Sequence, residues 1–577
     1  DGTALGLTSN GMTVANNLVM TGSNDPIIDT GANSATWAGV ISGAGFLTKQ
    51  GSGVLTLSST ANNYTGATNV AQGMLQAAAV NSFSRSSAHS VAAGAMLDLA
   101  GYSQSLSSLS NSGIVNLSSH GGGTPGAVLT LTGPYVGNNG TLGISTVLAA
   151  DSSATDKLLM SGSNAIASGS TAIQITNAGG LGAQTTGSGI EVVATENGAS
   201  LQPGSFSLAG GHVDAGAYEY RLFQTAQGAT LQSTNTQPGP NPDPSPVAYR
   251  SEVPLVSALP AQLRQADAAM LGDLRKRMGD DNVTGTANSS SFSSDTGFGR
   301  RAWGRILRTD PSITQQGTVS PQSSGHLTGF QAGLDLYASQ SFKGGFYVGQ
   351  LQGDMSVTGF AGGIDRKYVG FNSLTSRYLG LYGTWQNASG LYADAVLQGA
   401  DYRNTLHTSE NTGAAGSSVT NGSGVLASLE LGQAFTLGSH WQIEPQAQIS
   451  YRTLNLHDSA MSLAQVRNKA DSDWTLRLGA RIKGSFTTSV GQFQPYGRIN
   501  VYKASNTSDV ASFVAPAATT QIAAKGGYTS TELAAGASLQ INPRTSVYGE
   551  LGKLWANGGE SWVKSGVQAS VGVRVQW

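Results

Sequence analysis

The carboxy-terminal half of this chain repeats one pattern, in which apolar and polar side chains alternate over segments of about ten residues. Successive side chains of a β-strand point to opposite faces, so the pattern predicts strands that each have one apolar face. About twelve such segments follow one another, at 303–307, 326–337, 343–357, 370–386, 391–404, 422–436, 441–453, 472–486, 491–504, 528–541, 545–556 and 565–577.

The connections between these segments alternate between short and long. Short turns lie at 387–390, 438–440 and 542–544. Long polar loops lie near 309–325, 358–369, 405–421, 454–471 and 505–527. A membrane barrel has short turns at one end and long loops at the other. Because the first connection is long, the first strand of such a barrel runs outward and the last residue lies on the periplasmic side.

A soluble β-sandwich remains an alternative, because its strands also alternate between an apolar and a polar face. In the barrel, the apolar faces point to lipid, and one of them contains Tyr347, Leu351 and Met355. Aromatic residues near strand ends favour the barrel, since they suit a membrane interface. These residues are Trp385, Trp441, Trp555, Tyr392 and Tyr548.

Composition narrows the choice further. No apolar run reaches the roughly 18 residues of a membrane helix, so a membrane protein with this sequence has to be a barrel. Hydrophobic residues make up 39% and charged residues 11%, with 78 glycines, which suits strands and turns and argues against disorder. The net charge of −2 gives no reason to expect nucleic acid as a partner. The absence of cysteine excludes disulfides, zinc–thiolate sites and thiol nucleophiles, and it suits a chain that passes unfolded through a pore.

At 577 residues the chain is expected to contain two or more domains. Its amino-terminal region has a different sequence pattern from the carboxy-terminal half. From 43 to 57 and on to 76, strands of three to five residues recur between Gly and Asn corners. Such spacing predicts rungs of a parallel β-helix, each burying its apolar side on the next. A β-sandwich of short strands is the alternative. The chain begins at Asp1 without a basic, apolar leader, so we expect that a signal peptide and further upstream sequence have been removed.

Between these two regions lie a proline-rich stretch and one long helical pattern. The stretch 238–246 contains five prolines and is typical of a stiff, extended linker. The run 258–278 predicts a helix that ends at Gly279. One face of this helix carries Leu259, Leu263, Met270, Leu274 and Met278. Its polar residues include Arg264, Gln265, Asp267, Arg275 and Lys276. A helix packed on the core of an ordinary domain would show the same pattern.

Several motifs resemble those of one family, the autotransporters. Residues 46–57 and 63–68 resemble the passenger-associated repeat of that family. Asp156, Lys157 and Leu158, with Tyr218, Tyr220 and Leu222, resemble the autochaperone segment of pertactin-like autotransporters. The segment 276–280 resembles the consensus after the pore helix, and 444–448 and 494–496 resemble parts of the barrel domain.

The last eight residues resemble the terminal signal of bacterial outer-membrane barrels. Val571, Val573, Val575 and Trp577 alternate with polar residues or glycine up to the aromatic carboxy-terminus. The resemblance implies that the barrel-assembly machinery reads this strand, with Ser570, Gly572, Val575 and Trp577 as the signal residues.

The resemblance implies an all-β fold, in which a right-handed parallel β-helix passenger segment is joined by a pore-spanning α-helix to a 12-stranded antiparallel transmembrane β-barrel. The expected divisions are the β-helix at 1–117, the autochaperone segment at 118–236, a linker at 237–256, the pore helix at 257–279 and the barrel at 300–577. In the lumen, Asp394, Glu444, Gln446, Arg452 and Arg498 are expected to hold the helix.

The implied function is type V secretion. The barrel anchors in the outer membrane and moves its own passenger, an adhesin or virulence factor, to the cell surface. The implied partners are outer-membrane lipid, the barrel-assembly machinery, periplasmic chaperones and, for the passenger, host surface or matrix ligands. The protein is expected to be monomeric, without a cofactor. The alternatives are an adhesin for which the barrel is only an anchor, a hydrolase or protease whose catalytic part lies upstream of Asp1, and a porin.

Serine-protease autotransporters of enterobacteria cleave themselves inside the barrel at an Asn-Asn pair. At that place this chain has Gly272-Asp273, which implies that the passenger stays attached or is released by another route. None of the seven histidines has a metal-ligand spacing, and the chain lacks a Gly-x-Ser-x-Gly elbow and a phosphate loop. His457 and Asp458 are adjacent, which does not produce triad geometry. The sequence therefore predicts no catalytic residue and no metal site.

Overall fold

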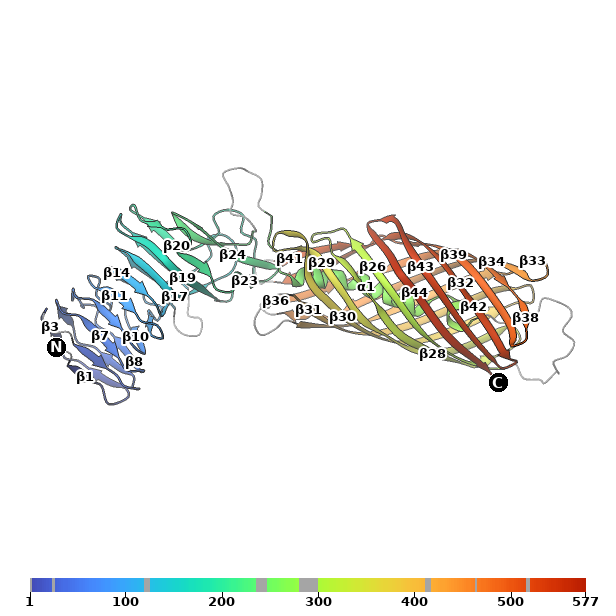
Figure 1. Ribbon diagram of the computed structural model, residues 1–577, viewed down its shortest axis with the longest axis horizontal. Coiled ribbons are helices and arrows are strands. Elements are labelled where there is room, and N and C mark those ends of the chain that lie inside the picture. The colour runs from blue at the N-terminus through green and yellow to red at the C-terminus, as the bar shows by residue number, and fades with distance from the viewer. Residues whose placement is uncertain are drawn as a thin grey trace. The chain divides into compact units, whose positions relative to one another are not determined.

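The computed structural model describes residues 3–22, 26–118, 125–234, 246–279, 299–409, 417–461, 464–514 and 519–577. It divides into two compact units, with the boundary after Arg250 (Figure 1). All but the last residue of the proline-rich stretch 238–246 lies outside the described residues.

The first unit is a stack of short parallel strands, which is the predicted β-helix. Each strand pairs with the strand one turn further along the chain. One face contains β1 (Ala4–Gly6), β4 (Ile27–Asp29), β7 (Leu47–Gln50), β9 (Thr68–Val70), β11 (Ala88–Val91) and β14 (Ser108–Asn111). A second face contains β2 (Met12–Val14), β5 (Ala35–Trp37), β8 (Val54–Leu57), β10 (Met74–Ala77), β12 (Met96–Asp98) and β15 (Ile114–Asn116). The two faces meet at β17 (Tyr135–Thr146), which pairs with both β14 and β15, and β3 (Leu18–Met20) pairs with β6 (Ile41–Gly43).

Apolar side chains stacked in register form the core of this unit. Leu55, Leu75, Leu97, Val115 and Leu142 pair in succession from β8 to β17, and all five are fully buried. Each new turn therefore covers the apolar side chain of the turn before it, so the hydrophobic gain grows with the number of turns.

The stack ends in antiparallel strands. The remaining parallel strands are β13 (Gln104–Leu106), β16 (Val128–Leu131), β18 (Lys157–Ser161), β19 (Ile166–Asn177), β20 (Ile190–Glu196), β21 (Ser200–Leu201) and β22 (Phe206–Leu208). β20 then pairs antiparallel with β25 (Gly228–Gln232), which pairs with β24 (Tyr218–Thr225) and so leads to β23 (Val213–Ala215). This change of direction closes the open end that a solenoid would otherwise expose.

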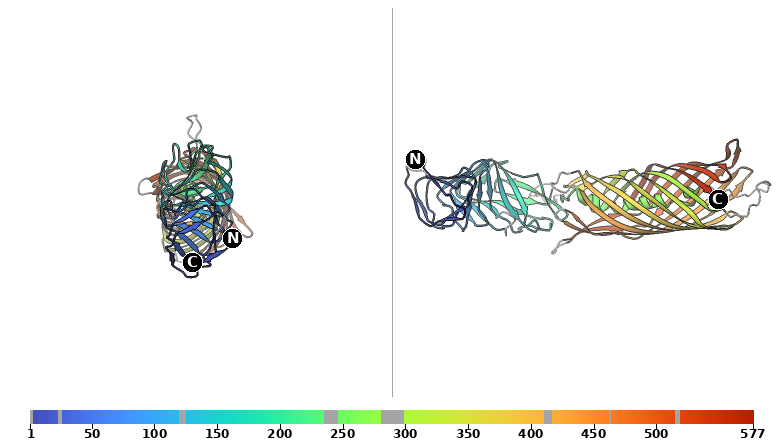
Figure 2. Two further views of the ribbon diagram at one scale, coloured as in Figure 1. Left: turned by 90° about the vertical axis from the view of Figure 1, so that its left-hand side faces the viewer. Right: turned by 90° about the horizontal axis from the view of Figure 1, so that it is seen from below.

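The second unit is a closed antiparallel barrel of twelve strands (Figure 2). Its strands are β26 (Arg301–Gln315), β28 (Leu327–Ala338), β29 (Phe342–Ala361), β30 (Ile364–Gln386), β31 (Leu391–Thr408), β32 (Ser417–Gln433), β34 (Trp441–Leu456), β37 (Asp473–Gly484), β39 (Gly491–Ala504), β42 (Tyr528–Asn542), β43 (Thr545–Gly559) and β44 (Ser561–Gln576). The first and last of these pair with each other from Arg301–Gln576 to Gln315–Ser561, which leaves the barrel without a free edge. The twelve predicted segments correspond to these strands in order.

Shorter strands extend the barrel at its two ends. β27 (Gln322–Gly325) pairs with β26 and β29, while β33 (Phe435–Leu437) and β38 (Phe486–Thr488) form hairpins at the opposite end. Two of the long loops combine into a separate four-stranded sheet of β35 (Ser459–Met461), β36 (Ala464–Lys469), β40 (Ser508–Val514) and β41 (Thr519–Lys525).

The prediction of which side chains face lipid is correct on most strands and wrong on part of β29. There, Tyr347, Leu351 and Met355 point into the lumen and are fully buried, while Gln352 and Asp354 face outward. The reason is local: this half of the strand lies alongside α1, whose Met270 contacts the wall at Gly349, so the apolar side packs on the helix.

The predicted aromatic girdle also needs a correction. Trp385, Trp441 and Trp555 are exposed on the outside of the barrel, as expected, but Tyr392 and Tyr548 are buried in the lumen. Both tyrosines lie at inward positions of their strands, and their hydroxyls need polar partners, which the lumen supplies.

The lumen contains the helix that follows the first unit. The prediction of one helix over 258–278 is wrong at both its start and its middle. α1 (Glu252–Leu271) begins earlier and contains Pro254 and Pro260, and a break at Gly272 and Asp273 separates it from α2 (Leu274–Met278). Among the described residues, no helix has the length and apolar character that a membrane span requires.

Candidate functional site: the helix inside the barrel

The helix is held in the lumen by charged side chains at several levels. In the second half of α1, Arg264 donates to Asp473 at 3.0 Å and to Asp509 at 2.5 and 2.8 Å. Asp473 begins the wall strand β37, whereas Asp509 belongs to β40 of the four-stranded sheet. One buried guanidinium therefore connects the helix to both the wall and that sheet. Buried charges are stable only when paired in this way.

One turn further along, the acidic side chain of Asp267 faces hydroxyl groups and an arginine of the wall. It accepts hydrogen bonds from the hydroxyls of Tyr402 at 2.8 Å and Tyr378 at 3.2 Å. Arg452 lies 3.8 Å from the same carboxylate, and it donates to Asp473 and to the backbone carbonyl of Arg264. Arg452 thus joins a side chain of the helix, its backbone and the wall.

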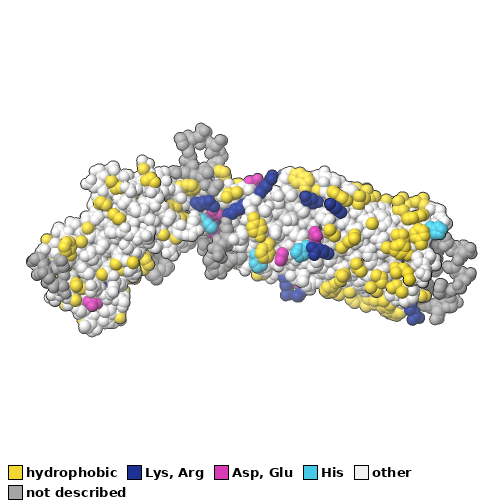
Figure 3. All heavy atoms as spheres, in the orientation of Figure 1, with side chains coloured by type: hydrophobic (Ala, Val, Ile, Leu, Met, Phe, Trp, Pro, Cys, Tyr) yellow, Lys and Arg dark blue, Asp and Glu magenta, His cyan; other side chains and the backbone are white. Residues whose placement is uncertain are grey.

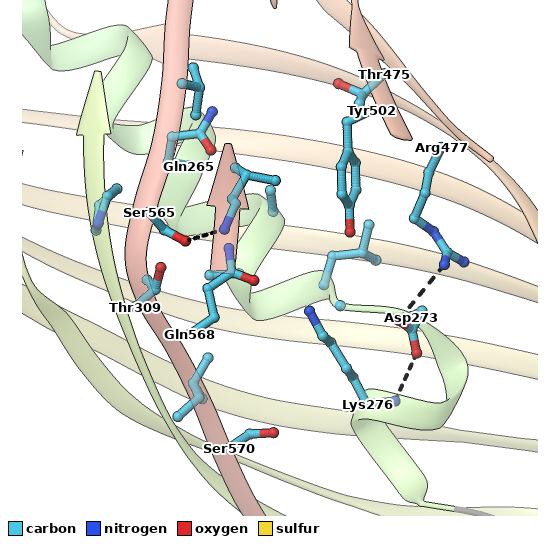
Figure 4. A pocket seen from close by; sticks show the side chains of 18 of the residues that line it. Gln265, Asp273, Lys276, Thr309, Thr475, Arg477, Tyr502, Ser565, Gln568 and Ser570 are labelled. Carbon is cyan, nitrogen blue, oxygen red and sulfur yellow. Dashed lines mark hydrogen bonds and ion pairs between the residues drawn. The ribbon is translucent and has the colours of Figure 1, made fainter. Parts of the chain in front are cut away.

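The helix break is built around Asp273. Its carboxylate accepts the backbone N–H of Lys276 at 2.8 Å, which caps the first turn of α2. The same carboxylate forms an ion pair with Arg498. It also lies 3.8 Å from Arg477, a contact that Figure 4 shows. Lys276 in turn reaches Glu532 at 2.9 Å. A side chain that shapes the helix therefore also contributes to the charge balance of two wall arginines, together with Glu430 and Glu550.

In α2, the basic residues face acidic residues of the wall. Arg275 lies 2.9 Å from Glu444, and Arg277 lies 2.6 Å from Asp394. The apolar side of the same short helix packs into an aromatic cluster on the lumen wall. The helix contributes Leu271, Leu274 and Met278 to this cluster, and the wall contributes Trp303, Tyr347, Tyr382, Tyr392, Val396 and Leu426. The lumen therefore has a small hydrophobic core of its own as well as a polar network.

Wall side chains also satisfy the backbone groups that helix ends leave unpaired. Arg305 donates to the carbonyl of Met270 at 2.9 Å, at the end of α1. Glu430 accepts the N–H of Leu274 at 3.1 Å, at the start of α2. At the end of α2, Tyr548 donates to the carbonyl of Arg277 and Arg574 to that of Met278. The barrel is therefore complementary to the broken form of this helix.

A cavity of about 120 Å³ remains between the helix break and the wall. Its lining is polar on both sides, including Gln265, Asp273, Arg477, Tyr502 and Gln568 (Figure 4). A polar space of this size has room for several water molecules. Within the described residues, no group of three or more histidine or acidic side chains could hold a metal ion.

The structure places the five residues expected in the lumen there. Asp394, Glu444, Arg452 and Arg498 contact the helix, while Gln446 donates to Glu444 at 2.6 Å. Of the predicted helix residues, Leu259, Leu263, Met270, Leu274, Arg275 and Met278 are all buried inside the barrel.

In the last strand, Val575 and Trp577 face outward, as do Val571 and Val573. Gly572 faces inward, and the ring of Tyr548 lies so close to it that an added Cβ would be 2.4 Å from the ring. A glycine is therefore required at this place for the tyrosine to reach the helix. Ser570 pairs with Leu307 of β26.

The residues compared with an autochaperone lie in the last parallel turns of the β-helix and in the closing strand β24. Asp156 is buried and accepts the backbone N–H groups of Gly126, Ala127 and Ser145 at 2.8 to 2.9 Å, together with the hydroxyl of Ser118. Leu158 and Tyr220 are fully buried and Tyr218 nearly so. Lys157 forms an exposed ion pair of 2.6 Å with Glu191. Leu222 is only partly buried.

Sequence reasoning missed several residues of the lumen network. Asp473, Glu430, Arg477, Arg305 and Arg574 all contact the helix or its partners. A signal was present, because each is a charged residue at an inward position of a predicted strand. Asp273 was noted only as a departure from a cleavage motif, although its place before a helical turn is typical of an N-cap.

Three family models match separate parts of the chain. They are the passenger-associated transport repeat at residues 47–77, the autochaperone domain type 1 at 104–222 and the autotransporter β-domain at 302–552. Along the chain they follow the order of the structure: the turns of the β-helix, its last turns with the closing strands, and the barrel.

Similar proteins come from several bacteria. The adhesin BmaC autotransporter of Brucella suis is 30% identical over 515 residues, which are 84% of this chain and 14% of that protein. The pertactin autotransporter of Bordetella bronchiseptica is 28% identical over 205 residues, 35% of this chain and 21% of that protein. The transport unit of AIDA-I from Escherichia coli aligns with 57% of this chain and all of its own, at 17% identity and a TM-score of 0.42. The chain thus spans a small part of the length of these two curated relatives.

This chain belongs to the autotransporters. Its barrel lies in the outer membrane, and its β-helix is part of a passenger exposed at the cell surface.

Proposed function

We propose that the barrel exports the passenger of its own chain and then retains it, with α1 and α2 as the segment left in the pore. The observation that supports this most is the complementarity between helix and lumen: wall residues neutralise the charges of α1 and α2 and satisfy the ends of the helix. Such a fit is expected for a segment that rests in the pore permanently. The helix begins directly after the passenger, so that end of the barrel faces outward.

A pair of epitope tags tests the export. One tag is inserted at the exposed turn Gly210–Gly211 of the passenger and a matched tag at the exposed turn Asn542–Arg544 of the barrel. In intact cells, antibody should reach the passenger tag, whereas the barrel tag should become accessible only after the outer membrane is opened. Accessibility of the second tag alone would reject this orientation.

We also propose that the seated helix closes the pore. α1 and α2 lie in the lumen, and their charged side chains pair with the wall at several levels. Full-length protein in planar bilayers should therefore show little conductance, and a variant without residues 252–279 should conduct steadily. High conductance of the full chain would favour the porin alternative.

For the passenger, we propose that the closing strands act as an autochaperone. Folding outside the cell would begin at this capped end and proceed turn by turn toward the amino-terminus. Each completed turn buries an apolar side chain such as Leu97, worth about 2 kcal/mol relative to exposure. Retreat through the pore then becomes unfavourable without any need for ATP.

The carboxy-terminal strand is proposed as the signal read by the barrel-assembly machinery, after delivery by periplasmic chaperones. Deleting Trp577 removes an outward aromatic side chain and leaves the lumen unchanged. We expect the variant to accumulate in the periplasm, as measured by cell fractionation and heat-modifiable mobility. Wild-type amounts of folded barrel in the outer membrane would count against the signal.

A second candidate role concerns the passenger itself. One relative is named an adhesin, and we propose that this passenger also acts by binding host surface or matrix ligands and that the exported protein is a monomer without catalytic activity. Cells that display the full chain should adhere to a coated matrix, and cells that display only residues 251–577 should not. Equal adherence of both would reject adhesion by the β-helix.

A further inference from the structure

The apolar band around the barrel has two different borders. At the end away from the start of α1, the outward positions nearest the border carry exposed tryptophans, including Trp385, Trp441 and Trp577. At the end where α1 begins, exposed Trp555 and Trp562 are accompanied by positively charged side chains. Outward carboxylates, including Asp354 and Asp401, also lie in this half of the barrel.

The positive charges lie at outward positions of five strands, in the half of the barrel where α1 begins. Along β26, the outward positions pass from Ile306 to Arg308, and along β30 from Leu379 to Arg377. On β39 the outward positions pass from Val501 to Lys503. On β43 and β44, Lys553 and Lys564 each lie between an exposed aliphatic residue and an exposed tryptophan, Trp555 or Trp562. We call the five residues the border cations: Arg308, Arg377, Lys503, Lys553 and Lys564. Figure 3 shows Lys and Arg side chains gathered on the part of the barrel near the start of α1.

Most border cations lack an acidic partner. Within the described residues, Arg377, Lys503 and Lys564 form no ion pair, and Lys553 lies over the ring of Trp555 at 5.6 Å from its centroid. Arg308 lies 3.0 Å from the carboxylate of Asp310. Arg377 lies directly across the sheet from Asp401, whose carboxylate is 3.3 Å from Arg403.

Cations farther from the band behave differently. Arg366 lies 3.6 Å from Asp365, Arg467 lies 3.8 Å from Asp458, and Lys525 lies 3.5 Å from Glu560. These three cations are therefore paired, as is Arg403 of β31, which lies 3.3 Å from Asp401, whereas, among the described residues, Arg377, Lys503 and Lys564 are not. Unpaired surface cations near one another attract anions from outside the protein.

The depth of the border cations identifies that anion. Lys and Arg can extend their charged ends from the edge of the apolar band to the level of the lipid headgroups. A phosphate at this level accepts hydrogen bonds from guanidinium and ammonium groups. Tryptophan beside a cation is also typical of a membrane interface.

We propose that the border cations bind the phosphate groups of anionic lipids in the outer leaflet of the outer membrane. The assignment of the leaflet rests on the orientation given under the proposed function, and the binding itself does not. Bound lipid would hold the barrel at a fixed depth with its apolar band in the hydrocarbon.

The test compares two variants with the same change of charge. The full chain and the variants are reconstituted in phosphatidylcholine vesicles that contain spin-labelled phosphatidic acid or spin-labelled phosphatidylcholine. The test variant is R377Q/K503Q/K564Q, which removes unpaired border cations. The control is R366Q/R467Q/K525Q, which removes paired cations of the loops. A third variant, R377K/K503R/K564R, keeps the charges at the border.

For the wild type, we expect phosphatidic acid to be enriched about fivefold over phosphatidylcholine at the protein surface, the effect of one cation near an anionic headgroup. The enrichment should fall by at least half in the test variant and persist in the control and charge-keeping variants. High salt should weaken it.

Equal loss in the control, or no loss in the test variant, would overturn the proposal. If the triple variant does not reach the heat-modifiable form of a folded barrel, the single variants R377Q and K503Q replace it, and each should lower the enrichment. The leaflet is tested separately by the two epitope tags. Lipid binding combined with an inaccessible passenger tag would contradict the orientation and leave the phosphate contact standing.

Discussion

Asp273 combines three tasks in one side chain: it caps α2, neutralises Arg498 and lies close to Arg477. Removing one partner of a buried pair leaves the other charge without compensation, which costs about 3–5 kcal/mol. We therefore predict that D273A lowers the stability of the barrel by about that amount. The measurement is the midpoint of thermal or urea unfolding in detergent micelles, followed by heat-modifiable mobility.

The exposed pair of Asp365 and Arg366 provides the control for this prediction. Both side chains are largely exposed, and such pairs contribute about 0–1 kcal/mol. D365A should therefore have the same unfolding midpoint as the wild type. If D273A did so as well, the network at the helix break would not contribute to the stability of the barrel.

His89 is a second residue with a testable consequence, because it lies inside the β-helix. Its Nδ1 is 3.1 Å from the carbonyl of Ser87, and Phe83 packs beside the ring. Burial lowers the pKa of His89 to about 4, against 6.5 for an exposed histidine. Between these values the unfolded chain binds a proton that the folded chain does not, so the stability of the passenger falls as the pH is lowered.

We predict a loss on the order of 3 kcal/mol in the free energy of unfolding of the passenger from pH 7.5 to pH 4. The measurement is resistance of the passenger to protease in urea, in the full chain. In H89L, which keeps an apolar side chain at this place, most of this pH dependence should disappear. A wild-type passenger equally stable at both pH values would show that the ring is protonated without cost.

At the scale of secondary-structure elements, α1 is connected to the four-stranded sheet formed by two loops. Arg264 joins Asp509 of β40 to Asp473 of the wall, and the backbone of Thr318, near β27, donates to Ala523 of β41 at 2.8 Å. The sheet is therefore tied both to the helix and to the rim of the barrel, and its position depends on a seated helix.

We predict that D509N loosens this connection and raises the frequency of open events in planar bilayers by at least about tenfold. Every 1.4 kcal/mol shifts an equilibrium tenfold, and a weakened buried pair costs more than that. D458N, which removes a carboxylate that pairs with exposed Arg467 in a neighbouring loop, serves as control. If D509N opened as rarely as the wild type, the contact between Arg264 and Asp509 would not contribute to closing the pore.

The elements differ in how far the sequence predicts them. The barrel strands follow from a period of two because each has one face on lipid, which imposes the same pattern on every strand. The period-two rule fails where a strand also packs against the helix inside the lumen. On β29 the inner face meets a helix, so Leu351 and Met355 turn inward, and the sequence near them does not record this helix.

The break in the helix could not be predicted from its own residues alone. The apolar pattern continues through Leu274 and Met278, although Gly272 weakens a helix by about 1 kcal/mol relative to alanine. The groups that stabilise the broken ends, Arg305 and Glu430, come from strands far away in the sequence. The charges of the lumen were predictable as inward residues, but their pairing depends on the closure of the barrel.

For the whole molecule, the decisive property is the direction in which the passenger folds. Its last turns are stabilised by features that the first turns lack: antiparallel closing strands, and Asp156, which gathers three backbone N–H groups and a hydroxyl. Leu55, by contrast, lies in the apolar ladder near the other end. If folding begins at the closing strands, a destabilising substitution at Asp156 should affect the folding of the whole passenger. A destabilising substitution at Leu55 should affect only the turns that fold later.

We predict that D156A prevents the passenger from becoming protease-resistant on the cell surface as a whole, since loss of the buried carboxylate leaves its donors unsatisfied at the point where folding begins. L55A, which costs about 2–5 kcal/mol in the core, should leave the carboxy-terminal turns resistant and expose only the turns before it. The measurement is limited proteolysis of intact cells, with antibodies to tags at Gly210–Gly211 and near the amino-terminus. If L55A abolished resistance along the entire passenger while D156A spared the amino-terminal turns, folding would proceed in the opposite direction, and the closing strands would be a cap without a role in export.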